Sequence, residues 1–382
     1  MAIYLDNNAT TLLDERVLAA MLPYLQQQYG NPSEIYTLGR EARQAIDIAR
    51  EQVAQLMNVQ PAQIIFTSGG TEANNWAVKH AFENSLIQNF YYSAIEHASI
   101  IETIKSLAKS NIASKVLPVT PTGLVDTAIF SDMAWAKNTL TSIMWANNET
   151  GVIQDIPYFA DKIRQAGGYF HCDAVQAIGK INADFSTSLC HSMSISAHKI
   201  HGPKGVGALI IDKLIDPSPL IHGGKQERGY RSGTENVAGI VGFGQAAEIT
   251  FNESIDSTQH CLLLQKRLEN KLEKIPGIKI FSKHEKRLPN TSFFALEGID
   301  GESMLMALDT EGIAVASGSA CSSMSEKPSH VLLAMGVDEE YARGAIRISL
   351  SKHNTDAEID KFIEILQKKM AVLRSISLTA EV

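Results

Sequence analysis

Hydrophobic residues along this chain follow two alternating patterns, short continuous runs and positions spaced three or four residues apart. The spaced positions within residues 42–56 predict an amphipathic helix, and further helical stretches separate most of the runs. This alternation indicates βαβ units, and therefore a mainly parallel sheet with helices on both faces. The runs that we interpret as buried strands are residues 63–67, 90–95, 116–119, 141–146, 168–172, 192–196 and 207–211.

A second region with a different pattern makes up the rest of the chain. It begins with a long helix whose apolar stripe ends at Pro276-Gly277, and its last helix opens with the capping box Thr355-Asp-Ala-Glu358. We therefore expect an α/β protein with a large domain of residues 15–250 and a smaller α+β domain of residues 1–14 and 251–382. The strands expected in the smaller domain are residues 291–296, 313–316 and 345–350.

The composition is that of an ordinary globular protein. Hydrophobic residues make up 45% of the 382 positions and charged residues 20%, and the formal net charge is -8. These values exclude a disordered chain and a protein built to neutralise nucleic-acid phosphates. From the sequence we expect no signal peptide, no membrane-spanning apolar stretch of ~18 residues and no disulfide framework. We expect a soluble cytoplasmic protein with reduced thiols, and neither nucleic acid nor membrane as a partner.

The segment Thr67-Ser-Gly-Gly-Thr-Glu72 lies between an expected strand and an expected helix. Glycine lets the backbone approach a ligand, and the N–H groups of a helix N-terminus favour an anion by about 0.3–1 kcal/mol. Gly70 and Thr71 are therefore candidates for binding a phosphate group. An ordinary turn capped by Thr71 is the alternative.

An acid and a lysine follow two of the expected strands, at the edge where open α/β sheets bind ligands. Asp173 comes after residues 168–172 and is suited to pair with a buried cation. Lys199 comes after residues 192–196, and a lysine whose pKa is lowered by burial is able to form a Schiff base. Lys204 fits the alternative role of an exposed lysine, and the spacing of a nucleotide-binding P-loop is absent.

Cys321 differs from the other cysteines of the chain. Cys172, Cys190 and Cys261 lie among apolar positions and are expected to be small buried side chains. Gly, Ser and Ala surround Cys321 without an apolar period, so we expect an accessible thiol, as a nucleophile must be. A surface cysteine without a role is the alternative.

Two motifs resemble those of known enzymes. Ser196-Ala-His-Lys199-Ile-His-Gly-Pro-Lys-Gly205 resembles the pyridoxal-phosphate lysine motif of class V aminotransferase-fold enzymes. Ser317-Gly-Ser-Ala-Cys321-Ser-Ser323 resembles the cysteine loop of the NifS/IscS-type cysteine desulfurases. The resemblance extends from residue 4 to beyond Arg347, and it implies the fold type I of pyridoxal-phosphate-dependent transferases. Other segments that match this family in order are Tyr4-Leu-Asp-Asn-Asn-Ala-Thr-Thr11, Gly30-Asn-Pro-Ser33, Ile95-Glu-His97, Ala146-Asn-Asn-Glu-Thr-Gly151, His222-Gly-Gly and Arg231-Ser-Gly-Thr-Glu-Asn236.

The resemblance also implies roles for individual residues. Lys199 would bind the cofactor covalently and move the substrate α-proton, and Asp173 would keep the pyridine nitrogen protonated. His97 would stack on the ring and assist proton transfer, and Arg347 would bind the substrate carboxylate through two hydrogen bonds. The remaining implied contacts are Asn148 and Gln176 to the ring oxygen and the substrate side, and Gly70, Thr71, Ser196, His198 and, across a homodimer, Thr234 to the phosphate.

The activity that this resemblance implies is the removal of sulfur from L-cysteine. L-Alanine would leave, and a persulfide on Cys321 would supply an iron–sulfur scaffold protein or another acceptor, tRNA thiolation included. No resident metal is expected. Transient ligation of an iron–sulfur cluster by Cys321 stays open, as does the base that deprotonates its thiol. The alternatives are a selenocysteine lyase, another class V pyridoxal-phosphate enzyme, and a binding platform without catalysis.

Overall fold

The computed structural model describes residues 2–83, 87–108, 113–133, 135, 137–317 and 328–380. Its large sheet has seven strands in the order β2-β8-β7-β6-β5-β3-β4. All neighbours in this order are parallel except β8, which pairs antiparallel with both β7 and β2. The expected mainly parallel sheet is therefore confirmed. Its strands are β2 (Ile64–Thr67), β3 (Asn89–Ser93), β4 (Ala113–Leu117), β5 (Thr139–Ser142), β6 (Tyr169–Asp173), β7 (Ser192–Ser196) and β8 (Gly207–Ile211).

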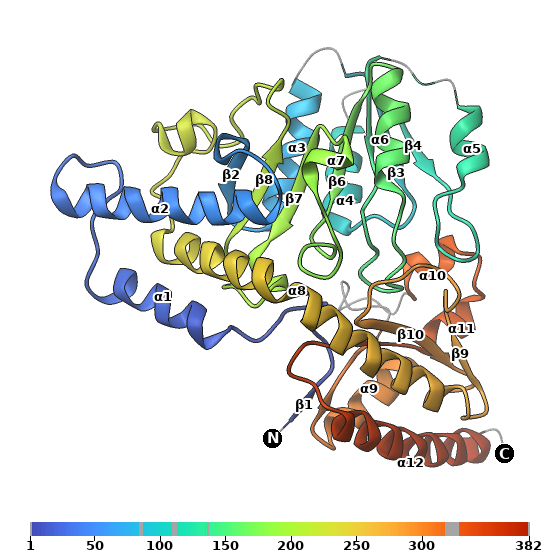
Figure 1. Ribbon diagram of the computed structural model, residues 1–382. Helices are drawn as coiled ribbons and strands as arrows, with labels where there is room; N and C mark the ends of the chain where they lie inside the picture. The colour runs from blue at the N-terminus through green and yellow to red at the C-terminus, as the bar shows by residue number, and fades with distance from the viewer. Residues whose placement is uncertain are drawn as a thin grey trace.

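Helices cover both faces of this sheet (Figure 1). Successive side chains of a strand point to opposite faces, and β2 shows the consequence. Ile64 and Phe66 belong to the apolar cluster that α2 and α8 cover, whereas Ile65 packs with Trp76 of α3 on the other face. The helices of this part are α1 (Glu15–Gln26), α2 (Thr37–Leu56), α3 (Gly70–Glu83), α4 (Ala98–Ala108), α5 (Thr127–Asp132), α6 (Ile156–Gln165) and α7 (Phe185–Ser188), with the 3₁₀ helices η1 (Pro61–Gln63), η2 (Ala197–Lys199) and η3 (Gln226–Gly229).

The smaller domain is built on a four-stranded sheet in the order β12-β13-β10-β9. Its strands are antiparallel. The first strand of the chain joins this part, because Ile3 of β1 pairs in parallel with Ile313 of β11. The elements are β1 (Ile3–Tyr4), α8 (Val237–Leu272), β9 (Ile278–Ile280), β10 (Thr291–Leu296), α9 (Gly301–Asp309), β11 (Ile313–Ala314), β12 (Ala316–Ser317), α10 (His330–Ala334), α11 (Glu339–Arg343), β13 (Ala345–Ser349) and α12 (Asp356–Ala380).

The helix α8 connects the two parts of the molecule (Figure 1). It is a continuous helix of 36 residues, and the helix expected after residue 250 is its second half. Its buried side chains up to Ile249 pack into the core of the large sheet, and those from Cys261 onward pack into the core of the small sheet. The transition between the cores thus lies inside α8, and we keep the domain division near residue 250 as a proposal.

Two local features have the structure that the sequence predicts. The capping box opens α12, where the Thr355 N–H donates to the Glu358 carboxylate at 2.9 Å and the Glu358 N–H donates to the Thr355 hydroxyl at 3.3 Å. The thiols of Cys172, Cys190 and Cys261 are buried. Across the described ranges, no helix combines the length and the apolarity needed to cross a membrane.

Candidate active site

A cavity of about 350 Å³ lies beside the carboxyl ends of β6 and β7. Arg347 from β13 and Asn8 from the N-terminal segment also line it, so both domains contribute to its wall. The cavity therefore gathers side chains that are far apart in the sequence. The predicted site residues that line it are Gly70, Thr71, His97, Asn148, Asp173, Gln176, Ser196, His198, Lys199 and Arg347.

Asp173 ends β6, and both oxygens of its buried carboxylate accept hydrogen bonds. Asn74 donates from Nδ2 to one oxygen at 2.7 Å, and the backbone N–H of Val175 donates to the other at 2.9 Å. His171 holds Asn74 in turn, with its Nε2 lying 3.1 Å from Asn74 Oδ1. Burial lowers the pKa of His171 to about 4, so this imidazole is neutral. Asp173 is thereby fixed as an acceptor suited to a protonated ring nitrogen.

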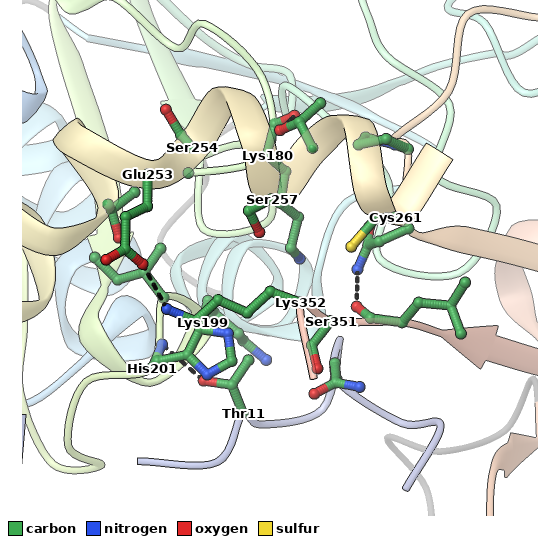
Figure 2. A pocket seen from close by; sticks show the side chains of 18 of the residues that line it. Thr11, Lys180, Lys199, His201, Glu253, Ser254, Ser257, Cys261, Ser351 and Lys352 are labelled. Carbon is green, nitrogen blue, oxygen red and sulfur yellow. Dashed lines mark hydrogen bonds and ion pairs between the residues drawn. The ribbon is translucent and has the colours of Figure 1, made fainter. Parts of the chain in front are cut away.

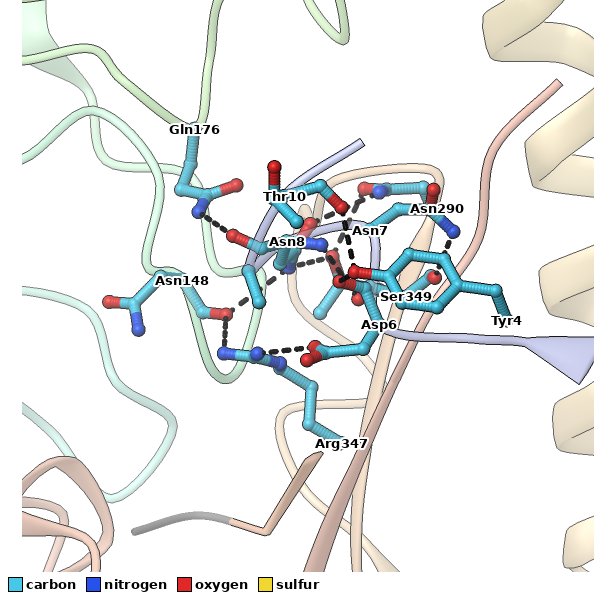
Figure 3. Close-up of polar contacts among 12 residues, drawn as sticks. Tyr4, Asp6, Asn7, Asn8, Thr10, Asn148, Gln176, Asn290, Arg347 and Ser349 are labelled. Carbon is cyan, nitrogen blue, oxygen red and sulfur yellow. Dashed lines mark hydrogen bonds and ion pairs between the residues drawn. The ribbon is translucent and has the colours of Figure 1, made fainter. Parts of the chain in front are cut away.

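The amine of Lys199 faces the N-terminal segment. It donates to the backbone oxygen of Asn8 at 2.5 Å and to that of Ala9 at 2.7 Å. Gln176 donates from Nε2 to the same Asn8 oxygen at 2.9 Å (Figure 3). The first residues of the chain therefore orient both the lysine and the glutamine that the sequence predicts for the site.

His97 contributes a neutral imidazole to the cavity. The backbone N–H of Ser99 donates to His97 Nδ1 at 3.1 Å, so Nε2 carries the hydrogen of the neutral ring. Burial lowers the pKa of His97 below its usual value, although the nearby Asp173 carboxylate acts in the opposite direction. A neutral ring at pH 7 is able both to stack on a cofactor and to exchange a proton.

The N-terminus of α3 and the end of β7 form a cradle that fits a phosphate group. A Cβ on Gly70 would lie 2.6 Å from Cγ2 of Val175, so glycine is required for this close approach. The hydroxyl of Ser196 is buried and, within the described residues, has no hydrogen-bond partner. A ligand oxygen would accept hydrogen bonds from this hydroxyl and from the N–H groups that open α3. This donor set matches the phosphate of pyridoxal phosphate.

Arg347 brings the smaller domain into the site (Figure 3). One of its terminal nitrogens donates to the Asp6 carboxylate at 2.6 Å, and the other donates to the backbone oxygen of Asn148 at 3.0 Å. Its Nε is buried and has no partner in the part of the chain that the structure describes. Each terminal nitrogen keeps a second N–H, so the guanidinium has further donors for a carboxylate in the cavity that Arg347 lines.

Two predicted site residues are not in this wall. Cys321 lies in residues 318–327, outside the described residues. Thr234 is described and exposed, and it does not line the cavity within one chain. For metals, the described ranges contain no group of three or more His, Cys, Asp or Glu side chains that could hold an ion.

Sequence reasoning missed three polar residues that position the site. His171 falls inside a run predicted to be buried, where a polar side chain needs a partner. Asn74 lies on α3 shortly after the phosphate cradle, and Asn8 belongs to a segment that matches the family without an assigned role. The polarity of these residues was the available signal, but their partners were not visible in the sequence.

Comparisons with known proteins identify the family. The model of the family aminotransferase class V matches residues 3–362. The chain is 42% identical over 376 residues to cysteine desulfurase 2 of Trichormus variabilis and 41% identical over 378 residues to the cysteine desulfurase IscS of Methanosarcina thermophila. Each match covers 98% of this chain and 94% of the relative.

Solved structures agree with this assignment. A NifS-like protein has a TM-score of 0.92 at 39% identity, with 98% of this chain and 100% of that chain covered. A structure of SspA in complex with cysteine has a TM-score of 0.80 at 30% identity, with 92% and 100% covered. The chain therefore belongs to the class V aminotransferase family, whose members generally depend on pyridoxal phosphate. Its expected fold and its similarity to NifS/IscS-type cysteine desulfurases are confirmed.

Proposed function

We propose that this protein is a cysteine desulfurase that transfers sulfur from L-cysteine to Cys321. The observation that carries the proposal is the convergence on one cavity of the Lys199 amine, the Asp173 carboxylate and Arg347. These are the groups needed to bind a cofactor covalently, to charge its ring and to bind an amino-acid carboxylate. The names of the relatives and the cysteine-bound structural neighbour support L-cysteine as the substrate.

The cofactor that these residues fit is pyridoxal phosphate. Bound at Lys199, it would supply an electron sink that weakens the bonds at Cα and Cβ of the substrate. The negative charge of Asp173 would keep a proton on the ring nitrogen, and two donors hold its carboxylate in position. The Ser196 hydroxyl and the α3 N-terminus would bind the phosphate, and the cradle's fit supports this assignment.

Lys199 and His97 are the groups that would move protons. The amine of Lys199, once released, would take the proton from Cα and return a proton later in the reaction. The backbone oxygen of Asn8, 2.5 Å from Nζ, orients this amine. His97 is neutral because burial lowers its pKa, and with Nδ1 held by the Ser99 N–H it is able to exchange a proton through Nε2.

Cys321 would act as the nucleophile in sulfur transfer. Its thiolate forms a bond to the substrate sulfur as the Cβ–S bond breaks, and Cβ gains a proton. L-Cysteine and the Cys321 thiol thus become L-alanine and a Cys321 persulfide, with all atoms conserved. An ordinary thiol with a pKa of about 8.5 is only a few per cent ionised at pH 7, so a base must assist. We propose an iron–sulfur scaffold protein, or another acceptor such as a tRNA-thiolation enzyme, as the recipient.

An apolar surface near α1 supports a homodimer. Leu25, Tyr29 and Ile35, on the end of α1 and the connection to α2, are 62%, 82% and 86% exposed. Several large exposed apolar side chains in one segment are typical of an interaction surface. In such a dimer, the exposed Thr234 would reach the cofactor phosphate of the partner subunit.

Replacement of Cys321 by serine tests the proposed function. We expect Cys321→Ser to bind pyridoxal phosphate and L-cysteine but to release almost no alanine, because a serine hydroxyl cannot replace the thiolate. Cys261→Ser is the matched control, since Cys261 lies outside the cavity wall, and it should retain turnover. Full alanine production by Cys321→Ser would refute this nucleophile. A wild-type protein that binds no pyridoxal phosphate would refute the function as a whole.

A further inference from the structure

Lys180 lies behind the cavity, four residues after Gln176. Its Nζ donates to Gln176 Oε1 at 2.6 Å and to Asn8 Oδ1 at 3.0 Å. The preceding Gly179 has a φ of +70°, and a Cβ there would lie 2.8 Å from methyl groups of Ile200 and Thr250. The turn that directs Lys180 toward these two amides therefore requires glycine. Lys180 itself does not line the active-site cavity of about 350 Å³.

These two bonds hold both carboxamides in one orientation, together with the backbone oxygens of Asn8 and Asn148, which accept from Gln176 Nε2 and from Asn8 Nδ2 at 3.2 Å. The oxygen and nitrogen ends of a carboxamide have nearly the same shape, and its hydrogen-bond partners select the orientation. Lys180 donates both bonds, so Gln176 and Asn8 turn their oxygens toward it. Gln176 then directs Nε2 toward the backbone oxygen of Asn8 at 2.9 Å, on the cavity side.

The surroundings of Lys180 are unusual for a lysine. Both acceptors are neutral, and within the described residues it forms no ion pair with a carboxylate. Burial, followed by the charges of Lys199 and Arg347, lowers its pKa well below the ordinary value, with Cys261 acting in the opposite direction. It faces a second, smaller cavity of about 60 Å³ under α8, which Cys261 and Lys199 also line (Figure 2). Even as a neutral amine, Lys180 keeps two N–H groups for the two amide oxygens.

We propose that Lys180 is a positioning residue that, together with the backbone oxygen of Asn8, holds the hydrogen-bond polarity of Gln176 in the cofactor site. With its oxygen held by Lys180, Gln176 presents an N–H donor, rather than an oxygen acceptor, to the ring oxygen of the cofactor. The inference rests on the proposed function, because it concerns the residue expected to contact that oxygen. It gives a role to a lysine that does not line the active-site cavity.

The pH dependence of the bound cofactor's visible absorption tests this role. We expect Lys180→Met to bind the cofactor but to raise the pH midpoint of its colour change by about one unit, a tenfold change in proton affinity. The ring oxygen loses the donor that Lys180 holds in place through Gln176, which makes the linkage to Lys199 more basic. Lys266→Met, which removes an exposed lysine of α8 outside the cavity, is the matched control and should not shift the midpoint.

A double-mutant cycle separates positioning from a general structural effect. If Lys180 acts through Gln176, Lys180→Met should add nothing to the shift that Gln176→Leu causes. Fully additive shifts, or an unchanged midpoint in Lys180→Met beside a shifted Gln176→Leu, would overturn the inference. If Lys180→Met does not bind the cofactor, Lys180→Arg replaces it. That variant keeps the donors and should titrate at or below the wild-type midpoint, and a raised midpoint would overturn the inference. A wild-type protein without a cofactor band would instead contradict the proposed function.

Discussion

Arg347 and Asp6 form an ion pair of 2.6 Å between the ends of the chain, next to the candidate active site. The pair joins β13 of the smaller domain to the segment that follows β1 (Figure 3). It occupies one terminal nitrogen of the guanidinium, and the backbone oxygen of Asn148 occupies the other. The geometry therefore fixes the guanidinium plane, and the N–H groups that these two partners do not use stay available to a ligand.

Arg347→Lys should weaken substrate binding although it preserves the charge. A lysine cannot contact Asp6, Asn148 and a substrate carboxylate in one plane. Because a hydrogen bond between charged groups contributes about 1.5–3 kcal/mol, we expect the KM for L-cysteine to rise about 10- to 100-fold. Steady-state kinetics measures this rise, with cofactor occupancy determined in parallel. Arg343→Lys, on the surface of α11, is the control, and an unchanged KM in Arg347→Lys would contradict the assigned role.

Glu96 should make the stability of the protein depend on pH. It is fully buried, and burial, with the Asp173 charge nearby, raises its pKa from 4.5 to about 8. The folded state holds the proton more tightly than the unfolded state, so Glu96 costs no stability below about pH 4.5, destabilises the fold progressively as pH rises from there to about 8, and adds no further loss above that. Glu96→Gln cannot ionise. We expect it to exceed the wild type by roughly 3–5 kcal/mol in unfolding free energy at pH 9, and by little at pH 4.5.

Urea unfolding of the cofactor-loaded proteins across this pH range measures the difference. Glu102→Gln is the matched control, because Glu102 is an exposed glutamate on α4 that pairs with Lys105. It should change stability by less than about 0.5 kcal/mol at every pH. A Glu96→Gln protein whose advantage does not grow with pH would contradict the buried, protonated state of Glu96.

Ser329 should stabilise the junction between the domains. Its hydroxyl donates to the buried carboxylate of Glu149 and accepts from the backbone N–H of Leu332 at 3.2 Å. Ser329→Ala leaves a buried carboxylate oxygen without this donor, so the unfolding free energy should fall by about 1–3 kcal/mol. Denaturant unfolding measures the fall, and Ser329→Thr, which keeps the hydroxyl, should restore most of it. Equal stability of the alanine and threonine variants would show that the hydroxyl contributes nothing.

The exposed apolar segment after α1 should mediate self-association. Tyr29→Glu and Ile35→Glu place charges on side chains that are 82% and 86% exposed in the single chain, so they should not disturb its core. At an interface the same charges would be desolvated, and dimers should dissociate. Sedimentation equilibrium measures the change. Ile255→Glu, on the equally exposed side chain of α8, is a control away from this segment. Dimers that persist in both variants would exclude this surface as the interface.

The regular strands of the fold could be predicted because a strand buried on both faces is a continuous run of apolar residues. β7 and β8 span the residues of two such runs. The direction of β8 could not be predicted, since an apolar run does not encode whether its neighbour is parallel. β1 and β9 are two and three residues long and carry no pattern of their own. β1 exists through its pairing with β11, a partner distant in the sequence.

The residues of the candidate site likewise fall into a part that the sequence predicts and a part that it does not. Lys199 and Asp173 could be predicted because each stands in a local motif at the end of a strand. The residues that hold them could not, because their contacts join distant segments: Lys180 with Asn8, and Asn74 with Asp173. Local sequence thus indicates which groups perform chemistry, while only the fold shows which groups orient them.

Mass analysis of the purified protein after brief exposure to L-cysteine tests the central claim most directly. The account predicts that the peptide containing Cys321 gains the mass of one sulfur atom, that a reductant removes it, and that one alanine appears for each sulfur added. Peptides containing the buried Cys172, Cys190 and Cys261 should stay unmodified. Alanine formation without sulfur on Cys321, or sulfur on another cysteine instead, would contradict the account.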